Sequence, residues 1–124
     1  MNILFYSPTT DDVEIRLHKA IAAVTQKDDI EVYRTINSLS RRLLHSTESR
    51  VVAVLLAASR EHLSELISIN DMLSKASIIL ILPDSEPETV ALGHILLPRF
   101  LSYNDSDFMD VAAVLSKMLS KGHT

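Results

Sequence analysis

The chain has 124 residues, a length that fits one domain with one hydrophobic core. It contains no cysteine, which excludes disulfides, thiolate metal sites and a cysteine nucleophile. Its formal net charge of −4 argues against broad electrostatic capture of nucleic acid or of an anionic membrane. The apolar runs are too short to span a bilayer, and no signal-peptide pattern opens the chain, so we expect a cytoplasmic protein.

Short apolar runs alternate with helix-period segments from the start of the chain. The first run, Ile3–Tyr6, precedes a helix for which Asp11 and Glu14 are placed as N-cap and capping-box partner. The second run covers residues 30–36 and alternates in part between apolar and polar residues. Asn37 or Ser38 is placed to cap the short helix that follows it.

The pattern continues through the second half of the chain. Residues 51–58 are apolar throughout, and Ser59 can cap one helix that extends as far as Leu73. Residues 78–82 form a fourth run, and residues 85–88 resemble a helix start, with an early proline and a glutamate three residues after serine. A weaker fifth run covers residues 99–103, and the last helix stops near Gly122.

Five such units predict a three-layer α/β domain over residues 1–124, with a five-stranded parallel sheet and five helices. Strands covered on both faces are continuously apolar, whereas edge strands tolerate polar residues. The first, third and fourth runs are continuous, while the second and fifth contain Glu31, Arg34, Arg99 and Ser102. We therefore expect the flavodoxin-like and CheY-like strand order 2-1-3-4-5.

In this architecture ligands bind beyond the carboxyl ends of the strands, so the residues at those ends carry the functional prediction. In length, unit order and strand character the chain resembles the receiver domains of response regulators in two-component systems. The resemblance implies an acidic pair after strand one, a phosphoryl-accepting aspartate ending strand three, a hydroxyl residue ending strand four and a lysine ending strand five.

The sequence departs from that family pattern at each of these positions. Where the family has the acidic pair, the acceptor, the hydroxyl residue and the lysine, this chain has in turn Ser7 and Pro8, Ala57 and Ala58, Leu82, and Tyr103. Phosphoryl transfer needs an acceptor, a metal and a charge clamp together. We therefore interpret the chain as a non-enzymatic pseudo-receiver that takes part in signal transduction through protein–protein interaction.

The resemblance also implies where a partner protein of a signalling pathway would bind. Receivers commonly bind partners or dimerise through their fourth helix, fifth strand and fifth helix, which correspond here to residues 88–121. The candidates on this surface are Leu92, His94, Phe100 and Tyr103. A homodimer through this face is compatible with the resemblance, and burial of Leu92 and Phe100 in the core is the competing interpretation.

Two alternatives place a ligand at the carboxyl edge of the sheet. Residues 7–10 resemble the hydroxyl-rich phosphate loop of flavodoxins, but no glycine allows close approach and few aromatic residues are present to hold a flavin, so we expect no cofactor. A divalent metal could bind the carboxylates predicted at this edge, which are Asp11, Asp12, Asp84 and Asp105. Ordinary helix capping explains these acidic residues as well, so we assign no metal site.

Overall fold

The computed structural model describes residues 2–45 and 51–121. Gly122, which was predicted to end the last helix, lies outside the described residues. The elements are, in chain order, β1 (Ile3–Tyr6), α1 (Asp12–Ala22), the 3-10 helix η1 (Lys27–Asp29), β2 (Ile30–Tyr33), α2 (Ile36–Leu44), β3 (Val51–Leu56), α3 (Arg60–Ser68), α4 (Asn70–Leu73), β4 (Ala76–Leu82), α5 (Pro87–His94), β5 (Phe100–Tyr103) and α6 (Met109–Lys121). In these described ranges, no helix combines the length and the apolar character needed to cross a membrane.

The strands form one parallel sheet in the order β2-β1-β3-β4-β5, which confirms the predicted topology. Side chains of β1 and β3 are buried on both faces, as a strand between two helical layers requires. β2 and β5 lie at the two edges and are only partly buried. Polar residues in the second and fifth runs therefore indicated the edge strands correctly.

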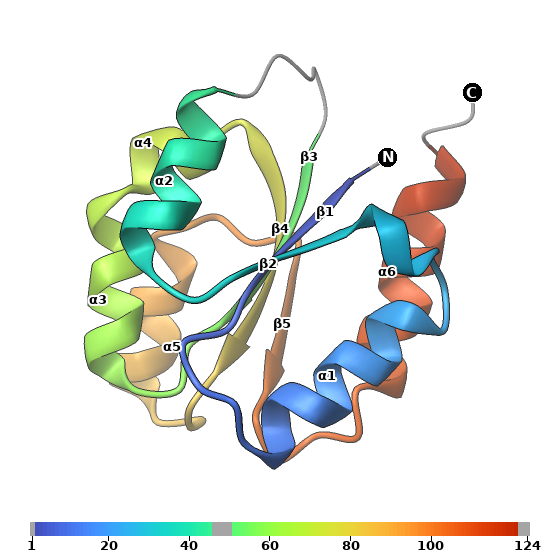
Figure 1. Ribbon diagram of the computed structural model, residues 1–124. Helices are drawn as coiled ribbons and strands as arrows, with labels where there is room; N and C mark the ends of the chain where they lie inside the picture. Colours follow the sequence, from blue (N-terminus) through green and yellow to red (C-terminus); the bar gives the residue numbers. More distant parts are fainter. Residues whose placement is uncertain (1, 46–50, 122–124) are drawn as a thin grey trace.

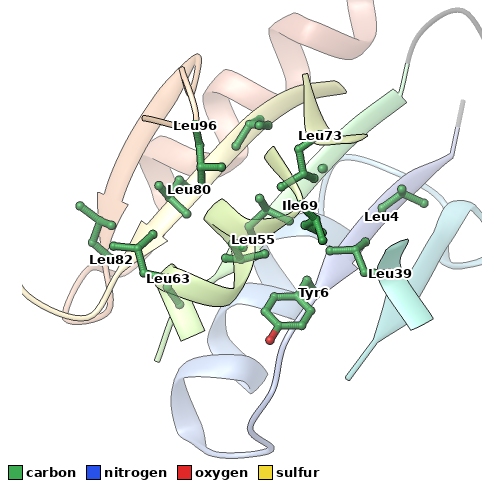
Figure 2. Close-up of a cluster of buried hydrophobic side chains, with 14 of the residues drawn as sticks. Leu4, Tyr6, Leu39, Leu55, Leu63, Ile69, Leu73, Leu80, Leu82 and Leu96 are labelled. Atoms are coloured by element: carbon green, nitrogen blue, oxygen red, sulfur yellow. The ribbon is translucent and has the colours of Figure 1, made fainter. Parts of the chain in front are cut away.

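Helices cover both faces of the sheet and create two separate hydrophobic clusters. On one face α2, α3, α4 and α5 pack over alternate residues of the strands, among them Leu4, Leu55 and Leu80 (Figures 1 and 2). On the other face α1 and α6 enclose the intervening residues, including Phe5 and Val54 (Figure 1). The alternation of strand side chains thus assigns each residue of β3 to one of two cores.

The helix starts agree with the sequence prediction at two junctions and differ at two. Asp11 caps α1 by accepting from the amide of Glu14 at 3.3 Å, and Ser59 caps α3 by accepting from that of His62 at 3.2 Å. The predictions of Asn37 or Ser38 for α2 were wrong, because Thr35 accepts from the Ser38 amide at 3.1 Å. At α5 the N-cap position is Glu86, so the proline is at the first helical position as expected but Ser85 is not the cap.

The described chain contains six α-helices, because the helix predicted after Ser59 is divided into α3 and α4. The division falls at Ile69, whose φ of −110° and ψ of 25° leave the helical region. Ser68 and Asn70 flank this residue, and such side chains compete with helical hydrogen bonds. The break still buries Leu73 against the same cluster as Leu66.

Gly93 sets how closely α5 approaches the sheet. The residue is buried, and a Cβ atom at this position would lie 3.1 Å from a methyl of Leu82 and 3.2 Å from a methyl of Leu80. Such distances are shorter than ordinary van der Waals contact, so a larger residue would force the leucines to move. The absence of a side chain at residue 93 therefore lets α5 lie directly on β4.

A polar cluster joins the edge strand β2 to helix α2. The Glu31 carboxylate accepts from Arg42 at 2.8 and 3.3 Å, from the Tyr33 hydroxyl at 2.7 Å and from the Asn2 amide at 2.7 Å. These hydrogen bonds, of which that from Arg42 has the largest effect, lower the pKa of Glu31 below its ordinary value. Burial, together with the bond to Glu31, raises the pKa of Tyr33 to about 12.

Glu31→Gln is therefore expected to destabilise the protein at neutral pH by about 1–2 kcal/mol, as loss of hydrogen bonds between charged groups does. A carboxylate whose pKa is lower in the folded state contributes stability above its unfolded pKa and loses it as pH falls through the folded value. Wild type should thus lose more stability than Glu31→Gln on acidification below about pH 5. Urea denaturation over a pH series measures this difference.

Glu65→Gln is the matched control, because it removes the same charge from an exposed helical residue. It should follow wild type across the acid range. Parallel pH profiles for wild type and Glu31→Gln would contradict a stabilising role for the cluster.

Candidate functional site at the carboxyl edge

The strand ends that would form a receiver site do meet at one edge of the sheet. The amide of Ala57 donates to the carbonyl of Ile81 at 2.9 Å, and the amide of Asn104 donates to that of Leu82 at 3.0 Å. Leu82 pairs with Tyr103 in the β4–β5 register. The predicted positions after β3, β4 and β5 are therefore neighbours, as the topology requires.

The floor of this edge is apolar and closed. Ala57 and Leu82 have no exposed surface, and both belong to the cluster beneath α2, α3, α4 and α5. Tyr6, at the end of β1, is 1% exposed, and its burial raises the pKa of its hydroxyl to about 12. Ala58 is only partly buried. A phosphoryl group above β3 would meet hydrocarbon instead of a nucleophilic carboxylate.

In the loop after β1, the polar groups of Ser7 are hydrogen-bonded within the protein. Ser7 is fully buried; its hydroxyl donates to the carbonyl of Thr9 at 2.8 Å and its amide to that of Tyr33 at 2.9 Å. Pro8 has no amide hydrogen to offer. The Thr9 hydroxyl oxygen is buried and has no hydrogen-bond partner within residues 2–45 and 51–121. Directly after β1, Ser7 and Pro8 therefore supply no acidic pair.

Arg34, just beyond β2, holds the same loop from outside. One of its terminal nitrogens donates to the carbonyl oxygens of Thr9 at 3.0 Å and Ser7 at 3.4 Å. The other pairs with the Glu14 carboxylate of α1 at 3.0 Å. In the sequence, Arg34 indicates only an edge strand, because its contacts are with residues 20 or more positions away.

Arg16 of α1 holds the turn between β5 and α6 in the same way. Its guanidinium donates to the carbonyl oxygens of Asn104, at 3.0 Å, and of Ser106, and it pairs with Asp12 at 2.9 Å. Its central carbon also lies 5.3 Å from the ring centre of Phe108, a cation–π geometry. Phe108 is buried at a φ of 64°, so this arginine stabilises a turn that contains a left-handed residue.

Arg60, the first residue of α3, joins that helix to the start of α5. It donates to the buried hydroxyl of Thr89 at 2.8 Å, pairs with Glu88 at 3.1 Å and also pairs with Glu86. The hydrogen bond from Thr89, with help from the Glu86 amide and the Arg60 charge, lowers the pKa of Asp84. Arg60 thus gives the acidic β4–α5 junction an internal cation.

The structure does not bring the four candidate metal ligands together as one site. Asp11 caps α1, Asp12 pairs with Arg16, and Asp84 accepts from the amide of Glu86 at 3.0 Å. Asp105 is exposed in the β5–α6 turn. In the part of the chain that the structure describes, no three histidine, aspartate or glutamate side chains are grouped as a metal ion requires.

The predicted interaction residues are divided between the two faces of β5. Leu92 and Tyr103 are half-buried against the cluster of Leu80, whereas Phe100 packs against the cluster of Val54. His94 is exposed at the end of α5. The competing interpretation of Leu92 and Phe100 as core residues is therefore right in part.

Several strongly exposed apolar residues near this face were missed by the sequence analysis. Ile95 is 47% exposed, Leu97 84% and Met109 73%. Periodicity gave no signal for Leu97, since it lies in a connection rather than in a helix or strand, where it adopts a φ of 51°.

A cavity of about 230 Å³ lies at the opposite, amino edge of the sheet. It is lined by Leu43, Leu44, Val51, Asp71, Met72, Lys75 and Ala76. Its place between the end of α2 and the α4–β4 turn does not coincide with the crevice where this architecture binds ligands.

A scan against protein-family models and a search of curated proteins found no match to this chain. The receiver resemblance therefore stays a prediction, and the fold and the geometry of the carboxyl edge carry the functional argument.

We expect Arg16→Met to destabilise the protein by about 2 kcal/mol, because three polar groups lose a charged donor. Thermal or urea unfolding measures the change. Arg99→Met is the matched control: Arg99 is exposed and has no ion-pair or hydrogen-bond partner for its side chain among the described residues, so the change should stay within about 0.5 kcal/mol. Equal effects of the two substitutions would contradict the proposed clamping of the β5–α6 turn.

Proposed function

We propose that this protein is a cytoplasmic, receiver-like module that does not carry a phosphoryl group and acts by binding another protein. The observation that supports it is the complete burial of Ala57 at the end of β3, the position at which the resemblance requires an accepting aspartate. No reorientation of a neighbouring residue supplies the acceptor, because β3 and the residue that follows it, from Val51 to Ala57, are all apolar and buried.

The three arginines support the same proposal from the loops. At the junctions where a receiver would hold Mg²⁺ and phosphate, Arg16, Arg34 and Arg60 each pair with a carboxylate. Arg16 and Arg34 also donate to carbonyl oxygens, and Arg60 donates to the hydroxyl of Thr89. Loops whose polar groups are already paired have less to gain from an incoming ion. In this proposal the carboxyl edge is a structural element, and recognition takes place elsewhere.

The proposed recognition surface is the side formed by α5, β5 and α6. Its part-exposed residues are Leu92, Phe100 and Tyr103, and the exposed residues Ile95 and Leu97 lie beside them in the chain. Exposed apolar side chains near one edge strand favour a protein partner over a small ligand. The partner is a protein of a signalling pathway or a second copy of the chain.

The phosphoryl mimic beryllofluoride, added with Mg²⁺, tests the loss of phosphoryl chemistry. We expect amide NMR resonances to stay unchanged, because Ala57 offers no oxygen to bind the mimic. Specific shifts of the amide resonances around Ala57 and Asp84 would contradict the proposal. Mg²⁺ alone is the second arm: saturable shifts that are lost in Asp84→Asn would favour the metal-binding alternative.

Introducing an aspartate at residue 57 tests whether burial at the end of β3 excludes a phosphoryl acceptor. Ala57→Asp is expected to destabilise the protein by about 3 kcal/mol or more, since it places an uncompensated carboxylate in a buried apolar position. Ala58→Asp, one residue further along and part-exposed, is the control and should cost about 1 kcal/mol. Urea denaturation separates the two. Equal stability, together with Mg²⁺ binding by Ala57→Asp, would indicate a latent phosphorylation site.

A further inference from the structure

Two exposed apolar patches lie at opposite ends of β5. The patch at its amino end consists of Ile95 and Leu97, which are 47% and 84% exposed. The patch beyond its carboxyl end contains Met109, the first residue of α6, which is 73% exposed. Figure 1 shows β5 running from the connection after α5 to the connection before α6, so the patches are separated by the length of the strand.

The patch at the amino end has only basic neighbours in the sequence. His94 and Arg99 are both exposed, and no acidic residue occurs between Glu88 and Asp105. The backbone amide of Arg99 donates to the carbonyl of Ile78 at 2.8 Å, which fixes this residue beside β4. Its guanidinium has no ion-pair partner among the described residues. This patch, defined as Ile95, Leu97 and Arg99, is apolar and cationic.

The charged residues nearest Met109 in the sequence are all acidic, and Arg16 of α1 reaches the carbonyl oxygens of Asn104 and Ser106 in the same turn. Met109 lies among the exposed residues Asp105, Asp107 and Asp110, and no basic residue occurs between Arg99 and Lys117. Asp107 accepts from the Met109 amide at 3.0 Å and Asp110 from the Val111 amide at 2.8 Å, which keeps both carboxylates at the start of α6. In the described ranges none of the three forms an ion pair. This patch, defined as Met109 with its aspartates, is apolar and anionic.

We propose that the two patches bind each other between copies of the chain, the cationic patch of one copy against the anionic patch of the next. Contact between Leu97 and Met109 would remove apolar surface from water, while Arg99 meets carboxylates that form no ion pair among the described residues. Contact between identical patches would instead bring like charges together. The inference rests on the proposed function and names a second copy as the partner of that face.

Because the two patches differ, the contact is heterologous. A dimer formed in this way still has one free cationic patch and one free anionic patch, so association continues into a filament or closes into a ring. A symmetric pair through the whole α5–β5–α6 face would stop at two copies. The pattern of assembly therefore distinguishes this arrangement from the homodimer considered above.

Analytical ultracentrifugation of the full chain over a wide concentration range tests the proposal. The average mass should rise with concentration beyond that of a dimer at low salt and fall on addition of salt, because salt screens the opposing charges. A chain that stays monomeric would overturn the inference. That outcome would leave the proposed function intact, since the phosphoryl-mimic experiment tests it separately.

Two complementary variants test the heterologous geometry. Leu97→Ser with Arg99→Ser removes the cationic patch, and Met109→Ser with Asp105→Ser removes the anionic one. Each variant alone should remain monomeric, whereas an equimolar mixture should form a dimer and nothing larger. Association of either variant alone, or no association in the mixture, would contradict the proposed contact.

Ile15→Ser with Lys19→Ser is the matched control. It removes an apolar residue that is 50% exposed and an exposed lysine from α1, neither of which belongs to either patch. Its assembly should equal that of wild type. A comparable loss of association in this control would show that general surface hydrophobicity, rather than the two patches, drives the contact.

Discussion

Burial of β3 on both faces is the constraint on which the rest of this structure depends. The strand lies between β1 and β4, and the helices on the two sides leave none of its side chains in contact with water beyond a few per cent. A central parallel strand in this position tolerates only apolar residues. The same packing that stabilises the sheet therefore leaves only apolar side chains at the carboxyl end of β3, where the resemblance implies a phosphoryl acceptor.

The arginines at the carboxyl edge follow from that constraint. A parallel sheet directs its helix N-termini, and with them capping carboxylates, towards one edge. These charges repel each other unless cations lie among them. Here Arg16 comes from α1, Arg34 from the connection after β2 and Arg60 from α3, and each joins two segments that are distant in the sequence.

The sequence predicted the sheet better than it predicted the loops. Strand order could be inferred from Glu31 and Arg99 because edge and central strands differ in the polarity that they tolerate. Asp11 and Ser59 were recognisable as caps because capping depends on residues three positions apart. Thr35 was missed since Asn37 and Ser38 offered equally good local signals. The break at Ile69 was missed because flanking residues such as Ser68 and Asn70 weaken a helix without always ending it.

For the candidate site too, features set by the local sequence could be predicted, whereas contacts between distant residues could not. The apolar character of residues 51–58 was visible in the sequence, and so was the absence of an acceptor. The partners of Arg16 and Arg60 were not visible, because a residue's charge does not say which carbonyl or hydroxyl lies beside it after folding. The exposure of Leu97 could not be predicted for a related reason. The sequence does not show whether a leucine in a connection between elements packs into the core or faces water.

Gly93 has a mechanical consequence for how α5 can move against the sheet. With no side chain at residue 93, the backbone of α5 lies against the methyl groups of Leu80 and Leu82. Sliding of the helix along the strand would drive backbone atoms into those methyls, so packing opposes this motion most strongly. A displacement of α5 along the strand is therefore coupled to the positions of Leu80 and Leu82 in β4.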